Sequence, residues 1–265
     1  MKVLSVVLCI FLILSCSEDE VIEESFVDNS IYKSVIAHRG FWRRASNTDN
    51  CIQGLREAVS ARIYGVEIDV SSSKDDSLIV AHGPNIGDYE ISKNNYEKLR
   101  TVKLANGEVV PTLREYLQEV QSLSPDLMLF VELKNASSKQ TIETIKSFDL
   151  PNPIIYISFY LYKLKELKKI DNSLTVLYLK GDKTPKELLD EGIDGIDYKT
   201  QILKDNPNWI DEAKALHMIT GGWVANARVD IEWCVKRGLD YITTDNPLDV
   251  ISYIRGSEIN SLMDY

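Results

Sequence analysis

The sequence predicts an α/β fold, a (β/α)8 TIM barrel, from three observations. Short β-branched runs alternate with helical segments from residue 34 onward, and eight such runs can be counted. Helix starts and stops are marked between them. The alternating region spans about 230 residues, which suits one barrel of this kind.

The eight predicted strands are short and apolar, and they occupy residues 35–38, 65–70, 127–133, 154–159, 175–178, 195–197, 219–224 and 240–243. Thr112 with Glu115, and Thr184 with Glu187, have the spacing of capping boxes, which begin helices. Gly238 stands where a helix should end. An open doubly wound sheet is the alternative, but the sequence has no glycine-rich phosphate loop after the first run, which disfavours its dinucleotide-binding version.

One apolar run, residues 78–82, does not fit the alternation. It follows Val70 after only the segment 71–77, whereas a parallel crossover needs a dozen residues or more. We therefore expect a β-hairpin extension after strand 2, which returns His82 to the same end of the barrel. Residues 84–110 are expected to form a short insertion above the C-terminal face, with one helix over residues 92–99.

The N-terminus is typical of an exported lipoprotein. Met1-Lys2 precedes an apolar run over residues 3–14, and Ser15-Cys16 resembles the end of a bacterial lipobox. We expect a signal peptide over residues 1–15, lipidation of Cys16, an acidic tether over residues 16–33 and the barrel domain over residues 34–265. A plain signal peptide or an uncleaved anchor remains the alternative.

This pattern predicts an outer-membrane lipoprotein of a Gram-negative bacterium, periplasmic or surface-exposed, held to the membrane through Cys16. The formal net charge of −10 disfavours nucleic acid as a partner, and the sequence shows no sign of an obligatory protein partner. The run of Lys163, Lys165, Lys168 and Lys169 is interpreted as a solvated helix face.

Ionisable residues gather where the predicted strands end, which is the end that carries the active site in such barrels. They are His38 and Arg39 after strand 1, Glu67 and Asp69 in strand 2, Glu132 and Lys134 in strand 3, and Asp245 after strand 8. Trp223 and Asn226 follow strand 7 at the same end.

Glu67 and Asp69 are two residues apart, so both side chains point to one face of their strand, and Glu132 and Lys134 repeat this spacing. Three buried carboxylates facing one lysine are under-compensated. All-oxygen ligation therefore predicts a bound divalent cation, Ca²⁺ or Mg²⁺. Each pair alone is also compatible with a solvated strand edge or a cross-strand ion pair.

Five motifs together resemble the glycerophosphodiester phosphodiesterase family, over residues 37–247. They are His38-Arg39-Gly40, Val66-Glu67-Ile68-Asp69-Val70, Ile79-Val80-Ala81-His82, Val131-Glu132-Leu133-Lys134 and the variant Trp223-Val224-Ala225-Asn226. The family's asparagine after the first motif is matched to Asn50, with Asn47 as the alternative. The family's His-Asp pair is His82-Gly83 here, so the neighbouring carboxylate is missing.

The resemblance implies metal-dependent hydrolysis of glycerophosphodiesters, the small molecules left when phospholipids are deacylated, to sn-glycerol 3-phosphate and an alcohol. It implies that a glycerol hydroxyl attacks first and that water then opens a cyclic phosphate. His38 and His82 are expected to supply base and acid, with His38 favoured as the base and the reverse assignment as the alternative. Glu67, Asp69 and Glu132 are expected as metal ligands. The substrate and its phosphate are assigned to Arg39, Lys134, Asn50, Trp223 and Asn226. A phospholipase D-like activity on lysolipids or sphingolipids, and a non-catalytic binding lipoprotein, are the alternatives.

Overall fold

The structure is a computed structural model that describes residues 34–124 and 126–263. The expected signal peptide, Cys16 and nearly all of the expected tether lie outside the described residues. Within the described ranges, the search for a helix with the length and apolar character needed to cross a membrane finds none.

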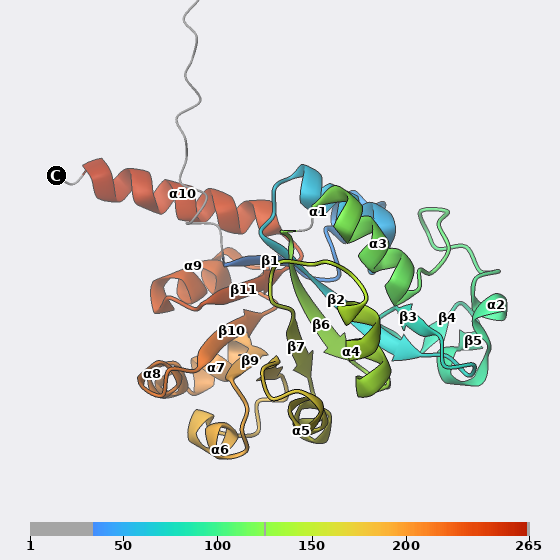
Figure 1. Ribbon diagram of the computed structural model, residues 1–265. Helices are drawn as coiled ribbons and strands as arrows, with labels where there is room; N and C mark the ends of the chain where they lie inside the picture. The colour runs from blue at the N-terminus through green and yellow to red at the C-terminus, as the bar shows by residue number, and fades with distance from the viewer. Residues whose placement is uncertain (1–33, 125, 264–265) are drawn as a thin grey trace, which may run out of the picture.

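The predicted eight-stranded parallel barrel is confirmed (Figure 1). Its strands are β1 (Val35–Ala37), β2 (Gly65–Ser72), β6 (Met128–Leu133), β7 (Ile155–Ser158), β8 (Thr175–Tyr178), β9 (Gly195–Lys199), β10 (Ile219–Trp223) and β11 (Tyr241–Thr244). Neighbours pair in the order β1-β11-β10-β9-β8-β7-β6-β2, and pairing of β1 with β2 closes the ring.

Helices connect the strands and surround the barrel (Figure 1). They are α1 (Ile52–Ser60), α3 (Leu113–Leu123), α4 (Ser138–Lys146), α5 (Leu161–Ile170), α6 (Pro185–Asp190), α7 (Thr200–Asp205), α8 (Asn208–Ala215), α9 (Arg228–Arg237) and α10 (Pro247–Met263), with the 3-10 turn η2 (Trp42–Arg44) before α1. Both predicted capping boxes are present, at the start of α3 and of α6.

The alternation of side chains along β2 separates two apolar regions. Val66, Ile68 and Val70 pack outward in the core shared with the helices. On the two neighbouring strands, Ile36 of β1 and Phe130 of β6 point inward and form part of a smaller core inside the barrel. Phe130 is the register partner of Glu67, so the inward-facing carboxylates of β2 and β6 adjoin this smaller apolar core.

The hairpin after strand 2 is confirmed. β3 (Leu78–Val80) pairs antiparallel with β2, with Val70 opposite Val80. β2 continues to Ser72 and is longer than predicted, because this pairing extends it past the barrel. Glu67 and Asp69 thus lie in the middle of the strand.

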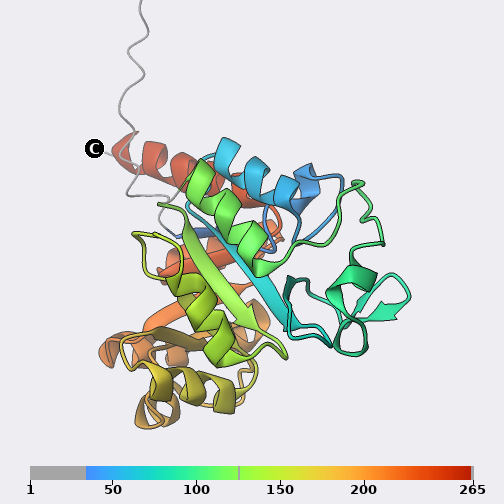
Figure 2. The ribbon, with the colours of Figure 1, turned by 45° about the vertical axis from the view of Figure 1, so that its right-hand side comes forward.

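The insertion projects beside the barrel (Figure 2) and holds β4 (Asn85–Ile86), β5 (Tyr89–Glu90), η3 (Ile91–Lys93) and α2 (Tyr96–Leu99) around a small apolar core of its own. The predicted single helix over residues 92–99 is wrong. Asn94 between η3 and α2 is extended, and its side chain donates to the carbonyl of Glu90 at 2.9 Å. Asparagine competes for backbone groups in this way and interrupts helices.

The interpretation of the lysine run as a solvated face is wrong for Lys163. This side chain is buried on α5, and its Nζ donates to the carbonyl of Ala136 at 2.7 Å. Lys163 and Leu164 are both covered by neighbouring elements, because together they form the inner side of the helix. Lys165 lies outside and pairs with Glu191.

Candidate active site

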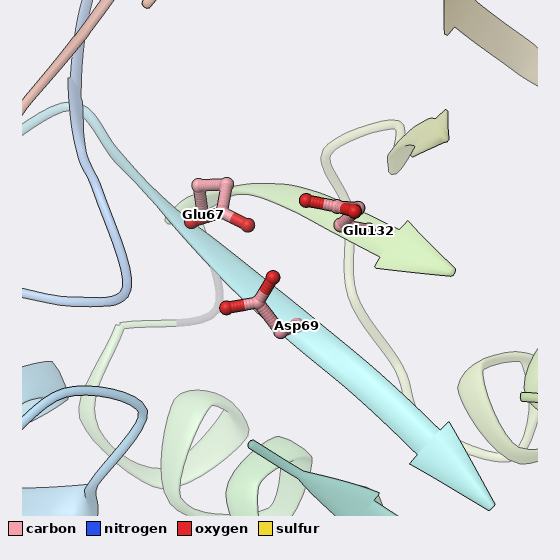
Figure 3. A group of neighbouring side chains, drawn as sticks. All are labelled: Glu67, Asp69 and Glu132. Atoms are coloured by element: carbon pink, nitrogen blue, oxygen red, sulfur yellow. The ribbon is translucent and has the colours of Figure 1, made fainter. Parts of the chain in front are cut away.

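Three buried carboxylates from two adjacent strands converge inside the barrel mouth (Figure 3). Glu67 and Asp69 come from β2 and Glu132 from β6, where Asp69 and Glu132 are register partners. One ligand oxygen from each residue lies within 4.8 Å of the others. The predicted convergence is therefore present, and its spacing is compatible with one shared cation.

These carboxylates are electrostatically strained without a cation. Burial, reinforced by the charges of Asp69 and Glu132, raises the pKa of Glu67 well above its ordinary value. Burial and the charge of Asp69 raise the pKa of Glu132 to about 7. Burial also disfavours ionised Asp69, but Lys134 outweighs it and lowers the pKa of Asp69. A divalent cation would relieve this repulsion, so the donor set fits one.

Lys134 is the one ammonium that reaches this carboxylate cluster among the described residues. Its Nζ lies 2.9 Å from Asp69 Oδ1 and 2.6 Å from Glu132 Oε1. The ammonium of Lys134 and the guanidinium of Arg39, whose Nε lies 3.5 Å from Asp69 Oδ2, are two positive charges against three carboxyl groups, so the cluster is short of positive charge. Lys134 therefore contributes to holding the carboxylates as well as facing the pocket.

Asn50 lies against Asp69 and is buried. Its Nδ2 donates to Asp69 Oδ2 at 2.8 Å, and its Oδ1 accepts from the Asp69 backbone N–H at 3.0 Å. Both ends of the amide are used, so Asn50 positions Asp69, and its expected contact with substrate stays a prediction. The alternative, Asn47, is exposed.

His38 is oriented by Asp245, which follows β11. His38 Nδ1 lies 2.7 Å from Asp245 Oδ1, and Nε2 lies 4.0 Å from Glu67 Oε2. Trp42 Nε1 and Asn226 Nδ2 also donate to Asp245, at 3.0 and 2.6 Å. Burial opposes the charge, but the hydrogen bonds from His38 and Trp42 prevail and lower the pKa of Asp245 to about 2.

Asn226 therefore holds Asp245, and its expected contact with substrate stays a prediction. Besides donating to the Asp245 carboxylate, it accepts the Asp245 backbone N–H at 2.9 Å. The sequence placed Asp245 at this end of the barrel without a role. Trp42 was not predicted at all, because it lies in a turn without a recognisable pattern.

Arg39 and His82 complete the charged part of the site. The Arg39 backbone N–H donates to Glu67 Oε2 at 2.9 Å, and its Nε lies 3.5 Å from Asp69 Oδ2. His82 is exposed at the rim, directly after Ala81, whose backbone N–H donates to the carbonyl of Asp69 at 2.9 Å. Partial desolvation lowers the pKa of His82, against the opposing charge of Asp69.

A cavity of about 250 Å³ joins these groups. Its ionisable lining residues are His38, Arg39, Glu67, His82, Glu132, Lys134, Asp197 and Lys199, and its other lining residues include Ile157, Phe159, Leu179 and Trp223. Phe159 and Trp223 pack edge to face, with ring centroids 5.6 Å apart. Trp223 thus lines the cavity, as its expected contact with substrate requires.

The model of the glycerophosphoryl diester phosphodiesterase family matches residues 38–249. The chain belongs to this family. It is therefore a phosphoric diester hydrolase of the glycerophosphodiester phosphodiesterase class, and the resemblance seen in the motifs is confirmed. The family depends on a divalent metal, which agrees with the buried carboxylate cluster.

Known members of the family match nearly their whole length. A glycerophosphodiester phosphodiesterase of known structure from Parabacteroides distasonis is 31% identical and superposes with a TM-score of 0.81. The match covers 85% of this chain and 98% of the Parabacteroides distasonis chain. One from Caldanaerobacter subterraneus subsp. tengcongensis is 26% identical over 244 residues, 83% of this chain and 97% of that protein. An Oleispira antarctica phosphodiesterase, solved in complex with the product sn-glycerol-3-phosphate, shares the fold at 21% identity and a TM-score of 0.75, over 84% of this chain and 96% of its own.

Proposed function

We propose that this phosphodiesterase hydrolyses glycerophosphodiesters to sn-glycerol 3-phosphate and an alcohol, with His38 as general base and His82 as general acid. The observation that carries the proposal is the oriented His38–Asp245 pair beside the buried carboxylate cluster. The product complex of the Oleispira antarctica relative supports sn-glycerol 3-phosphate as the product.

The cation of the proposed reaction is Ca²⁺ or Mg²⁺, held by Glu67, Asp69 and Glu132. Carboxylate oxygens are the ligands that these hard cations prefer. When bound, the cation supplies a Lewis acid that polarises a phosphoryl oxygen. Arg39 and Lys134 line the same cavity, and both lie near Asp69, so they add positive charge where the phosphate charge increases during reaction.

His38 is suited to accept a proton at Nε2. Since Nδ1 faces the carboxylate of Asp245 at 2.7 Å, the proton on the neutral ring resides on Nδ1 and Nε2 keeps its lone pair. The carboxylate then stabilises the imidazolium that forms when Nε2 removes a proton from the attacking hydroxyl or water.

His82 is suited to donate a proton to the leaving alcohol. It lines the same cavity, and its exposure at the rim allows it to recover a proton from solvent. Its lowered pKa makes the protonated ring a stronger acid. The missing carboxylate at Gly83 leaves the hairpin backbone, anchored to Asp69, to position the ring.

A release assay on glycerophosphocholine and glycerophosphoethanolamine tests the proposal. We expect sn-glycerol 3-phosphate from the wild type, its loss on chelation, and its recovery with Ca²⁺ or Mg²⁺. His38→Ala should abolish release, whereas His217→Asn, at an exposed histidine outside the cavity, should retain it. Unchanged release by His38→Ala would contradict the mechanism, and absence of turnover with retained ligand binding would favour a non-catalytic binding protein.

One observation favours phospholipase D-like activity on lysolipids as a second candidate. Tyr160 and Tyr162 are 51% and 64% exposed beside a groove that shares His82 and Lys134 with the active site. Exposed aromatic rings at a cleft suit contact with a lipid surface. Release of lysophosphatidic acid from lysophosphatidylcholine, reduced in Tyr160→Ala/Tyr162→Ala, would support this activity.

We also propose that the enzyme is an outer-membrane lipoprotein anchored through Cys16. The support is the sequence alone: a charged start, an apolar run and a cysteine after Ser15. Labelling with a radioactive fatty acid should modify the wild type and not Cys16→Ser. Labelling of both proteins would contradict the anchor, and so would labelling of neither.

A further inference from the structure

One carboxyl group that lines the catalytic cavity, that of Asp197, does not belong to the acidic cluster. Asp197 lies on β9 with its side chain toward the barrel interior, and the residue is only 2% exposed. Gly221 is its register partner on β10, and a Cβ at that glycine would approach Asp197 Oδ1 to 2.6 Å. The carboxyl group therefore occupies space that a side chain on β10 would otherwise fill.

Within the part of the chain that the structure describes, the Asp197 carboxyl group lacks a hydrogen-bond partner at one of its two oxygens. Its Oδ1 has no hydrogen-bond partner among the described residues. The Trp223 indole Nε1–H, which lies close by, donates at 2.9 Å to the backbone carbonyl of Asp197 and is thus already used. An unpaired buried acceptor is costly, so a donor from a ligand in the cavity would stabilise it.

The surroundings favour a hydroxyl over an ammonium as that donor. Lys199, two residues along β9, lines the same cavity with its Nζ 5.4 Å from the Trp223 ring centroid, and it would repel a second cation. Burial also raises the pKa of Asp197 to about 7, which weakens its preference for a positive partner. A hydroxyl both donates and accepts, so it matches either protonation state of the carboxyl group.

We infer that Asp197 binds a hydroxyl group of the substrate's glycerol moiety inside the cavity. The inference rests on the proposed function for the identity of the substrate. It assigns the phosphate to the region of Arg39 and Lys134 and the polyol to the region of Asp197 and Trp223. Asp197 is in this view a binding residue that distinguishes glycerol from an alkyl chain.

Calorimetric binding of two phosphate monoesters tests the inference without turnover. sn-Glycerol 3-phosphate and n-propyl phosphate have the same chain length and phosphate, but only the first has hydroxyl groups. With Mg²⁺ present, we expect the wild type to bind the first about tenfold more tightly, the scale of one hydrogen bond to a buried carboxyl group. Asp197→Ala should abolish that preference and leave the affinity for propyl phosphate within about twofold.

Asp197→Asn and Asp205→Ala are the matched variants. The amide is isosteric and retains an acceptor, so Asp197→Asn should fold and keep part of the preference. Asp205 is an exposed aspartate on α7, and removing it should leave both affinities unchanged. Circular dichroism confirms folding of each variant.

If Asp197→Ala weakened the binding of both ligands equally, Asp197 would belong to the phosphate site and the inference would be overturned. An unchanged preference in both Asp197 variants would overturn it as well. Failure of the wild type to hydrolyse any glycerophosphodiester would instead refute the proposed function, and the ratio of the two affinities would still decide the role of Asp197.

Discussion

Asp245 determines which nitrogen of His38 faces the cavity. The two residues are 207 positions apart in sequence, at opposite ends of the barrel domain, and meet because β1 pairs with β11. Trp42 and Asn226 hold the carboxylate from other directions. The proposed base is thus oriented by a residue that need not touch substrate.

Asp245→Asn should impair the chemical step more than binding. The amide removes the negative charge that stabilises the His38 imidazolium, so we expect kcat to fall on the order of 10²- to 10⁴-fold with KM little changed. Steady-state kinetics with glycerophosphocholine measures both. Asp190→Asn, which removes an exposed carboxylate that pairs with Lys186 on α6, should keep kcat within about twofold. A wild-type kcat in Asp245→Asn would show that the orientation of His38 is unimportant.

Asp197 should make the cation-free protein less stable as pH rises. Burial raises the pKa of Asp197 from 3.8 to about 7, so between these values the folded state binds more protons than the unfolded state. Its contribution to the free energy of unfolding is therefore complete below about pH 4 and falls by about 4 kcal/mol by about pH 7.

Asp197→Asn removes this titration. In urea unfolding with chelator, the free energy of unfolding of the variant should rise by about 4 kcal/mol relative to that of the wild type between about pH 4 and pH 7.5. Asp205→Asn should differ from the wild type by the same amount at both pH values. If the difference between Asp197→Asn and the wild type does not change with pH, Asp197 does not have a raised pKa.

The sequence could predict the residues that belong to motifs, but not the partners that the fold brings to them. Glu67, Asp69, Glu132 and the two histidines proposed as base and acid stand in recognisable patterns at strand positions. Asp197 does not, because it is one polar residue in an apolar strand, and only the missing side chain of Gly221 explains the space that it occupies. Such contacts depend on register between neighbouring strands.

At the scale of elements, β9 depends on close approach to its neighbours. A Cβ at Gly195 would overlap the backbone carbonyl oxygen of Ile219 and lie 2.7 Å from Leu177 Cδ2. The clash with backbone cannot be relieved by a rotamer change. Gly195→Ala should therefore force β9 away from β8 and β10.

We expect Gly195→Ala to lower the free energy of unfolding by about 3 kcal/mol, as overpacking does in closely packed interiors. Gly256→Ala in α10 is the control, since no atom of the residues whose side chains are described lies within 4 Å of its Cβ position, and it should raise stability by about 0.5–1 kcal/mol through helix propensity. Urea midpoints of the two variants should move in opposite directions. A wild-type urea midpoint for Gly195→Ala would mean that the backbone shifts at this position without loss of stability.

The strands could be predicted because their short apolar runs recur in a regular alternation with helical segments. All eight barrel strands and the hairpin were predictable, because each apolar run is bounded by turn or helix signals. The insertion was not, because the helical pattern over residues 92–99 is short and Asn94 can use its side chain in place of a helical hydrogen bond. Lys163 was misassigned because its aliphatic stem can cover apolar surface while its Nζ reaches a carbonyl.

At the scale of the whole molecule, the acidic cluster exists only when the barrel is closed correctly. Asp69 faces Glu132 through the register of β2 with β6, and Glu67 is fixed by the backbone of Arg39 after β1. An unfolded chain does not assemble these groups. A cation bound by the cluster must therefore stabilise the whole fold by mass action.

Thermal unfolding measures this coupling. At a free concentration of about 100 times its dissociation constant, Mg²⁺ or Ca²⁺ should add about 2.7 kcal/mol to the free energy of unfolding. This corresponds to a rise of roughly 5–10 °C in Tm over the chelated protein. Glu67→Gln should raise the Tm of the chelated protein, because a buried carboxyl group with a strongly raised pKa is removed, and should lose most of the cation-dependent rise. Glu97→Gln, at a side chain 85% exposed on α2, should retain the full rise. A wild-type Tm independent of both cations, or an undiminished rise in Glu67→Gln, would show that these three carboxylates do not bind the metal, because a ligand that binds only the folded state must raise its stability.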